Sequence, residues 1–353
     1  MYKILSSADE KKLLSKKLIE NQSDFFHLAA KKLGYHEEIL ACFTERGKDG
    51  SLIKRLIYKF SHERKTLVTC KAVVWGTSYI GMHLSSNKPA TTKILYSHHI
   101  PVPLQATIKT KTDLIKMLKR HSPLVVKPAD LTQGQGVVGN VTTPTQANIA
   151  FDIVKKTTQS RAFVIAEQQI FSKEFRVIVV NNRFAAAVYY QPPIIVGDGH
   201  SSIEALIKKE NASKLRMTGW TDSIKVNKQL DFNLQAIGMT KKSIPHKNEQ
   251  IVLHKVAPVS NGGILIDVTN TVCEENKKLF KKVSKLFGID ILGIDILAPS
   301  LEKSIVKTGG KIIEVNGGPD LGVHYNVHIG KRRNIAEIVL RNYFEPKRKL
   351  SQE

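Results

Sequence analysis

The sequence contains few cysteine, tryptophan and acidic residues. The shortages of cysteine and of acidic residues limit the classes of protein to which the chain can belong. Its 353 residues include three cysteines, two tryptophans and 31 acidic residues against 54 basic ones. Cys42, Cys70 and Cys273 are scattered, which does not suggest a disulfide framework or a zinc site. No run approaches the roughly 18 apolar residues that cross a bilayer, and the first residues contain no apolar block of signal-peptide length. We therefore expect a protein of the reducing cytoplasm without a membrane partner.

The shortage of acidic residues leaves a formal net charge of +23. Such an excess favours anionic partners such as nucleotides, acidic peptides or nucleic acid, but a surface that simply carries many lysines explains it equally well. The basic residues are spread along the chain, and no long basic tract with interleaved aromatic residues occurs. Nucleic acid is therefore not the expected partner.

The length and the mixture of patterns predict a fold of two or three domains. Helix-like and strand-like stretches alternate with hairpins, which predicts an α+β protein, that is, α/β with antiparallel sheets. Residues 1–95 read as helices plus short strands, with Asp24 as the cap of one helix. Asn181 and Asn182 predict a tight hairpin turn, because asparagine tolerates the positive φ that such a turn needs. Ser201 is expected to begin another helix in a capping box.

A glycine-rich loop beginning at Gly134 and Gly136 fits the pattern GxGxxG. The dinucleotide fingerprint requires a helix directly after these glycines, whereas β-branched residues follow here, and no GK[ST] is present for a P-loop. The pattern therefore indicates either an ordinary glycine-rich hairpin or a loop whose backbone covers phosphates. Lys127, at the end of the preceding strand, could place its ammonium group on phosphate oxygens.

Acidic side chains at four strand ends could complete a nucleotide site. Glu314 and Asn316 are two residues apart on one strand and therefore share a face, where a neighbouring strand could bring Asp295 beside them. Three hard oxygen donors of this kind suit Mg²⁺. Glu167 and Glu174 could bind the adenine and ribose of a nucleotide. Each residue alone is better explained as a structural hydrogen-bonding group, but their joint order indicates a site.

This order resembles the ATP-grasp superfamily, and most closely the ATP-grasp parts of cyanophycin synthetase and of the bifunctional glutamate–cysteine ligase/glutathione synthetase. The resemblance covers about residues 85–335 and is carried by the motifs SSNKPATTKIL, VVKPADLTQGQGV, EFRVIVVNNRFAAAV, PPIIVGDGHSSIEALI, NGGILIDVT, GIDIL and IIEVNGGP.

The resemblance implies an ATP-grasp fold with a small N-terminal α/β domain. The expected division is an N-terminal domain at 1–95, a central subdomain with the glycine loop at 96–168, a C-terminal subdomain with the metal site at 169–345, and a basic tail at 346–353.

The resemblance also implies a role for each residue of the nucleotide site. Lys88 and Lys127 would bind phosphates under the loop of Gly134 and Gly136, and Ile170 would pack on the base. Arg176, with Lys127, would act in catalysis by facing the phosphates or an acyl-phosphate. The remaining assignments are Glu167 at the adenine, Glu174 at the ribose, and Asp295, Glu314 and Asn316 on Mg²⁺.

The segment that contacts substrate in the relatives differs here. Where they usually have RxNxNLSTGG, this chain has His254 in place of the arginine, and Val256 and Pro258 in place of two asparagines. By resemblance the substrate residues would be His254, Ser260, Gly262, Gly263 and His324. Because two hydrogen-bonding side chains are replaced by apolar ones, we expect a less polar substrate than glutamyl-cysteine or an aspartate chain. His254 is also expected to titrate near neutrality.

The resemblance implies an ATP- and Mg²⁺-dependent ligase. It would join a carboxylate to an amine through an acyl-phosphate, releasing ADP and phosphate, with an amino acid or peptide as substrate. Two alternatives stay open: a nucleotide-binding regulatory module without ligation, and a ligase that modifies a protein tail. A homodimer is compatible with any of them.

Overall fold

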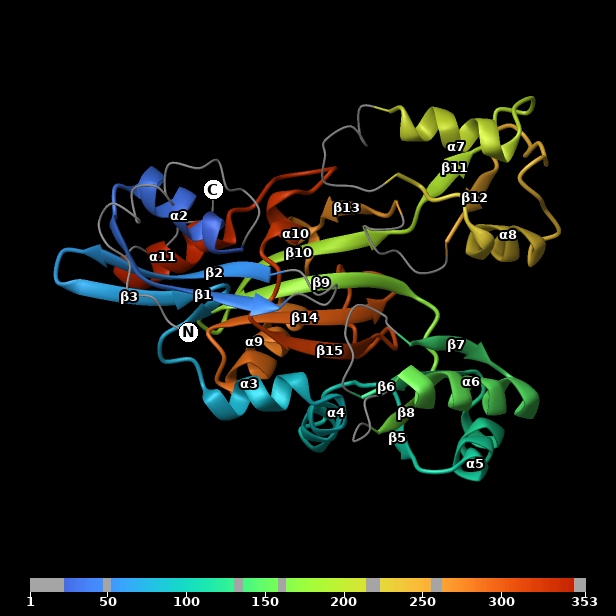
Figure 1. Cartoon of the computed structure of the whole chain (residues 1–353), viewed down its shortest axis with the longest axis horizontal. Helices are drawn as coiled ribbons and strands as arrows, with labels where there is room; N and C mark the ends of the chain where they lie inside the picture. Colours follow the sequence, from blue (N-terminus) through green and yellow to red (C-terminus); the bar gives the residue numbers. More distant parts are fainter. Residues whose placement is uncertain are drawn as a thin grey trace.

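The computed structural model describes residues 22–46, 52–129, 136–157, 163–213, 223–254 and 262–345. These residues form sheets of four, five, two and four strands, and every pairing between named strands is antiparallel. The expected α+β fold with antiparallel sheets is confirmed (Figure 1). No helix within these ranges combines the length and apolar character that crossing a membrane requires.

The first sheet is a four-stranded meander. Its strands are β1 (His36–Arg46), β2 (Leu52–His62), β3 (Lys65–Cys70) and β4 (Val73–Val74). Helices α2 (Gln22–Leu33) and α11 (Ile335–Phe344) share its core, which includes Phe26, Phe60 and Leu340. Because α2 begins at Gln22, Asp24 lies inside the helix, and the prediction that it caps the helix is wrong.

The central sheet has the order β13-β10-β9-β14-β15. Its strands are β9 (Lys173–Val180), β10 (Arg183–Gln191), β13 (Ile264–Asp267), β14 (Ile291–Ala298) and β15 (Lys311–Gly317). The predicted hairpin turn is confirmed, since Asn181 and Asn182 join β9 to β10 with φ of 47° and 60°. A short helix, α10 (Gly322–Tyr325), follows β15 and contacts β10 and β13.

One face of the central sheet carries a large apolar core. Val177 of β9 and Ile294 of β14 pack there against Phe280 of α9 (Glu274–Phe287). Helices α3 (Tyr79–Ser86) and α4 (Lys88–Ser97) also contact β15, so residues 79–97 already lie against this sheet. The opposite face is left for the polar residues of β9, β14 and β15.

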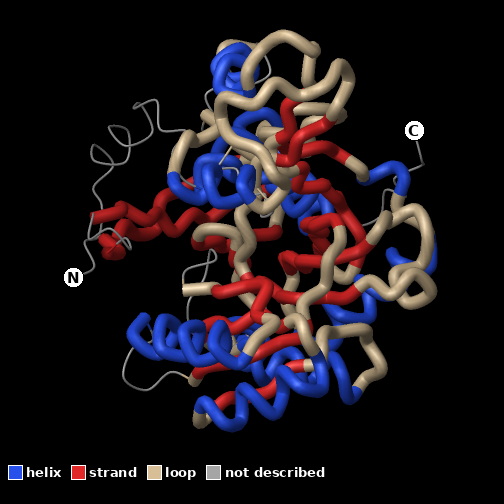
Figure 2. Tube along the Cα trace, turned by 90° about the vertical axis from the view of Figure 1, so that its right-hand side faces the viewer, coloured by secondary structure: helices blue, strands red, loops and turns tan. Residues whose placement is uncertain are grey.

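A second four-stranded sheet has the order β5-β8-β6-β7. Its strands are β5 (Gln105–Ile108), β6 (Leu124–Pro128), β7 (Val138–Val141) and β8 (Val164–Gln168), with α5 (Lys111–His121) and α6 (Pro144–Thr157) in the same core. Figure 1 shows α5 and α6 beside these strands, and Figure 2 turns the right-hand side of that view toward the reader. The four residues 169–172 join β8 to β9, and α4 contacts both β5 and β15, so the two sheets are neighbours.

A small unit projects beyond the end of β10 (Figure 1). It contains β11 (Ile194–Val196), β12 (Gln250–Val252), α7 (Ile203–Asn211) and α8 (Lys228–Gln235), with a core of its own. The hydroxyl of Ser202 accepts the N–H of Ala205 at 3.3 Å and caps α7. The predicted cap at Ser201 is therefore wrong: the backbone N–H of Ser201 donates instead to Asp198 at 2.7 Å.

Candidate functional site

A row of directly paired residues crosses the polar face of the central sheet. The register pairs Asp267 with Val188, Val188 with Arg176, Arg176 with Asp295, and Asp295 with Glu314. Directly opposed residues in neighbouring antiparallel strands project from the same face. The row therefore places Arg176, Asp295 and Glu314 side by side, with Asp267 at the far end.

Arg176 and Asp295 form a buried ion pair at the centre of this row. The Nε atom of Arg176 donates to one carboxylate oxygen of Asp295, and its Nη2 donates to the other at 2.9 Å. The amide of Asn316 donates to the same carboxylate at 3.0 Å. Gly293 leaves room for the guanidinium, since a Cβ there would lie 3.3 Å from Nη1 of Arg176. The resemblance implied that Arg176 belongs to the site, but it did not imply this pairing.

Lys88 reaches the row from the N-terminus of α4. Its ammonium lies 3.6 Å from Oε1 of Glu314, and its side chain is only 12% exposed. The helix is held there by Asn87, whose side chain accepts the N–H of Ala90 at 3.0 Å. The structure thus brings the predicted phosphate-binding lysine to the predicted metal-binding carboxylate.

Glu174 adds a third carboxylate on the same face, two residues before Arg176 and opposite Tyr190 of β10. Burial, together with the charge of Asp295, raises the pKa of Glu174 to about 7. Burial also raises the pKa of Tyr190. Negative charges therefore crowd one another at this point, and a bound cation would relieve the repulsion.

The residues present fit a magnesium ion. Asp295, Glu314 and Asn316 meet on one face as two carboxylates and an amide, which are hard oxygen donors. Within the part of the chain that the structure describes, no three His, Cys, Asp or Glu side chains alone form a metal-binding group.

Lys127 and Glu167 meet in the neighbouring sheet. The Lys127 ammonium lies 2.6 Å from Oε2 of Glu167, and both side chains are nearly buried. The amide of Gln105 donates to the other oxygen of Glu167 at 2.5 Å. Ile170 lies half-buried in the connection from β8 to β9. The candidate adenine residue is therefore paired with the second phosphate-binding lysine.

Of the two loop glycines, Gly136 is among the described residues and Gly134 lies outside them. Gly136 has a φ of +67°, and a Cβ there would lie 2.6 Å from Oγ1 of Thr157. A valine at Gly136 would therefore strain the backbone and meet the Thr157 side chain, so this glycine also matters for stability.

The expected substrate residues separate in the structure. Ser260, Val256 and Pro258 lie outside the described residues. Gly262 packs against Ile224 of the small unit, and Gly263 is buried just before β13. His254 is 3% exposed, and its Nε2 lies 3.4 Å from the carbonyl of Lys225.

Burial lowers the pKa of His254 below its ordinary value. The neutral imidazole therefore predominates at neutral pH, and the direction of the shift runs against the expectation that His254 titrates near neutrality. His254 does not replace the charge of the arginine that the relatives have at this position.

A polar cluster that we did not predict lies at the β13 end of the row. Arg333 donates from Nε and Nη2 to both oxygens of Asp267, each at 2.9 Å, and from Nη2 to Asn270 at 3.0 Å. Burial opposes ionisation of Asp267, but hydrogen bonds from Arg333 and Thr269 hold its pKa below the ordinary value. His324, on α10, is fully buried beside this cluster.

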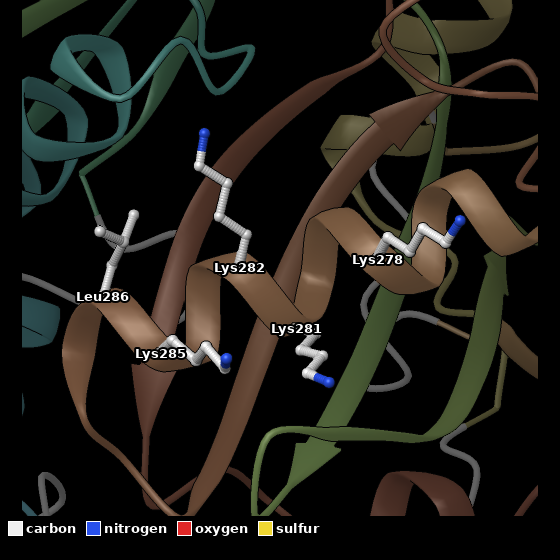
Figure 3. Close-up of a pocket in the computed structure, with 5 residues that line it drawn as sticks. All are labelled: Lys278, Lys281, Lys282, Lys285 and Leu286. Atoms are coloured by element: carbon white, nitrogen blue, oxygen red, sulfur yellow. The ribbon is translucent and has the colours of Figure 1, made fainter.

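A basic hollow lies on α9, the helix that covers the other face of the central sheet. Its volume is about 370 Å³, and it is lined by Lys278, Lys281, Lys282, Lys285 and Leu286 (Figure 3). The lysines are exposed and follow one side of the helix. Part of the positive charge is thus concentrated away from the candidate site, with the central sheet between them.

Comparison with known proteins agrees with this geometry. Residues 85–193 match the family model of the RimK-like ATP-grasp domain. Cyanophycin synthetase from Synechocystis sp. is 34% identical over 266 residues, which are 74% of this chain and 30% of that protein. The glutathione biosynthesis bifunctional protein GshAB from Desulfotalea psychrophila is 26% identical over 272 residues, covering 74% of this chain and 34% of that protein.

The fold comparison gives the same answer. The crystal structure of a bifunctional glutathione synthetase from Pasteurella multocida superimposes with a TM-score of 0.65 at 22% identity, over 92% of this chain and 43% of that one. The resemblance to the ATP-grasp superfamily is therefore confirmed, and the fold is an ATP-grasp fold. The chain spans about a third of the length of the curated relatives that it matches.

Proposed function

We propose that this protein is an ATP- and Mg²⁺-dependent ligase that joins a carboxylate to an amine and releases ADP and phosphate. The observation that carries the proposal is the row in which Arg176, Asp295 and Glu314 lie side by side with Lys88 over its end. Positive and negative groups of this kind, held in fixed positions, suit phosphoryl transfer, which depends on positioning and charge neutralisation more than on a protein nucleophile.

In this proposal each residue has one task. Asp295, Glu314 and Asn316 would hold Mg²⁺, which would supply charge neutralisation to the phosphates. Lys88 neutralises phosphate oxygens, and Arg176, fixed by Asp295, stabilises charge on the transferred phosphoryl group. These contacts favour attack of a substrate carboxylate on the γ-phosphate, forming an acyl-phosphate.

The nucleotide would lie between the two neighbouring sheets. Lys127 would contact phosphates, Glu167 the adenine and Glu174 the ribose, with Ile170 against the base. The ion pair of Lys127 and Glu167 supports this placement, because it already joins the phosphate-binding and adenine-binding groups within 2.6 Å. The short connection between β8 and β9 brings Glu174 within a few residues of that pair.

The proposed substrates are amino acids or peptides, one providing the carboxylate and the other the amine. The neutral, buried His254 supports a substrate that is less polar at this wall than glutamyl-cysteine or an aspartate chain. His254→Arg and Val256→Asn are expected to shift preference toward the polar substrates. A wild type that prefers those over every less polar candidate would refute this part.

The test is a screen for ADP release with ATP, Mg²⁺ and pairs of amino acids and dipeptides, followed by mass spectrometry of the products. We expect ADP and phosphate to appear with at least one pair, together with a product that has lost one water relative to the pair. AMP and pyrophosphate as products would refute the acyl-phosphate route. ATP binding without turnover for every pair would favour the regulatory module instead.

A further inference from the structure

His324 is a buried polar side chain without a hydrogen-bond partner. Its exposed fraction is 0%, and neither ring nitrogen has a partner among the residues that the structure describes. Its backbone, in contrast, is anchored: the carbonyl accepts the N–H of Arg333 at 3.0 Å, and its own N–H donates to Leu321 at 3.2 Å. Buried polar groups are almost always paired in native proteins, so such an exception calls for an explanation.

The position of His324 suggests what the missing partner is. Helix α10 packs on β10 and β13, at the end of the row opposite to Lys88. The charges of Arg176 on one side, and of Asp267 and Arg333 on the other, act on the imidazole. His324 therefore lies within electrostatic reach of Arg176, which is proposed to face the transferred phosphoryl group, on the side away from the proposed metal ligands.

The imidazole is held in its neutral form. Burial, reinforced by the positive charge of Arg176, lowers the pKa of His324 to about 3. A neutral imidazole has one N–H and one nitrogen lone pair, so it can accept a hydrogen bond throughout the neutral range. It is also a poor proton acceptor, because its conjugate acid would be buried beside two guanidinium groups.

In the proposed ligation, a group of this kind could orient the attacking amine. We propose that His324 accepts an N–H of the attacking amine and so defines the amine subsite, at the β13 end of the row. This proposal rests on the proposed function and gives one of its two substrates a place. His324 is here a binding and orienting residue for the amine, while the metal and nucleotide lie at the other end of the row.

The chemical step balances without proton transfer to His324. The un-ionised amine attacks the carbonyl carbon of the acyl-phosphate, a C–N bond forms, and the C–O bond to phosphate breaks with its electron pair leaving on the phosphate. The proton that the nitrogen loses is carried away by that phosphate. His324 directs the nitrogen lone pair toward the carbon by holding one N–H, which is a gain in orientation.

The test separates formation of the acyl-phosphate from its capture by the amine. His324→Leu removes the hydrogen-bonding atoms at similar size, and His324→Gln keeps an acceptor. The substrates are the best carboxylate and amine from the ADP-release screen, and hydroxylamine traps the acyl-phosphate as a hydroxamate. For His324→Leu we expect kcat/KM for the amine to fall about 10- to 100-fold, with hydroxamate formation within twofold of wild type. His324→Gln should recover most of the loss.

Thermal unfolding gives a second readout, with His328 as the matched control. The Nδ1 atom of His328 accepts the backbone N–H of Leu265 at 2.9 Å, so His328→Leu should lower the Tm without changing the amine KM. His324→Leu should leave the Tm unchanged or raise it, because it buries no unpaired nitrogen.

Two results would overturn the proposal while leaving the ligase function intact: an equal loss of hydroxamate and of amine turnover in His324→Leu, or a lowered Tm with normal amine kinetics. If the wild type forms neither ADP nor hydroxamate with any carboxylate, the proposed function fails, and the amine subsite fails with it.

Discussion

Replacing Glu174 by glutamine tests whether negative charge is truly crowded at the centre of the site. Burial and the charge of Asp295 raise the pKa of this carboxyl from 4.5 to about 7. At about 1.4 kcal/mol per pH unit, this difference corresponds to roughly 3 kcal/mol between the protonated and ionised forms. The side chain is partly buried, and Arg176 already offsets some of the repulsion, so this figure is an upper value.

The sign follows from the direction of the shift. Below pH 4.5 the Glu174 carboxyl is protonated in folded and unfolded chains alike. Between about pH 4.5 and 7 the unfolded chain loses this proton while the folded chain keeps it, so stability falls as the pH rises, and the loss is complete above about 7, where the folded chain must bury a charge. Glu174→Gln has no such loss. We therefore expect the variant to match wild type near pH 4.5 and to be more stable by up to about 3 kcal/mol at pH 8.5.

The measurement is urea unfolding followed by circular dichroism at both pH values, with EDTA present and nucleotide absent. Glu302→Gln, an exposed glutamate outside the site, is the control and should show no pH-dependent difference from wild type. If the difference in unfolding free energy between Glu174→Gln and wild type is the same at both pH values, the reasoning is refuted. Such a result would mean that ionisation of the Glu174 carboxyl does not destabilise the fold.

Other perturbations of the site are expected to separate stability from activity. Asp295→Asn leaves the buried guanidinium of Arg176 without its carboxylate and should lower the free energy of unfolding in urea by about 3–5 kcal/mol. Glu314→Gln, at a more exposed position, should keep its stability and lose about 100-fold or more in turnover. Equal stability of the two variants would contradict the role given to the ion pair. Gly136→Val should lower the Tm in a thermal melt, since valine strains a positive φ and meets Thr157; an unchanged Tm would show that the backbone there rearranges freely. EDTA should abolish ADP release and added Mg²⁺ should restore it, and turnover that is indifferent to both would rule out the metal assignment.

The sequence was a good guide wherever neighbours along the chain determine the structure. Asn181 and Asn182 identified the hairpin of β9 and β10 because a tight turn needs positive φ at both positions. Glu314 and Asn316 were correctly placed on one face, since strand geometry fixes the relation of residues two apart. The helix caps were less accurate: α7 is capped by Ser202, one residue after the predicted Ser201, where either hydroxyl satisfies the local pattern.

Features that depend on distant parts of the chain were missed. The long hairpin of β1 and β2 carries many charged residues, so its strands lack the apolar alternation that would have identified them. Arg333 was not identified, because its partner Asp267 is 66 residues away in the sequence. Asp267 ends a strand after three apolar residues, and Asp295 likewise follows apolar residues within its strand. This shared pattern was the signal that could have identified Asp267 as a site residue. The pairing of Arg176 with Asp295 required the strand order, which no local pattern contains.

The shared core of α2, α11 and the first sheet has a consequence for how the chain is made. Tyr35 donates its hydroxyl to Glu345 at 2.7 Å, and Lys32 lies 2.9 Å from Glu337, so contacts span about 300 residues of sequence. The N-terminal meander therefore cannot complete its core during synthesis until α11 has left the ribosome. Folding of this kind, dominated by contacts of high sequence separation, is slow. We expect truncation before α11 to yield aggregation-prone chains even though every residue of the nucleotide site is present.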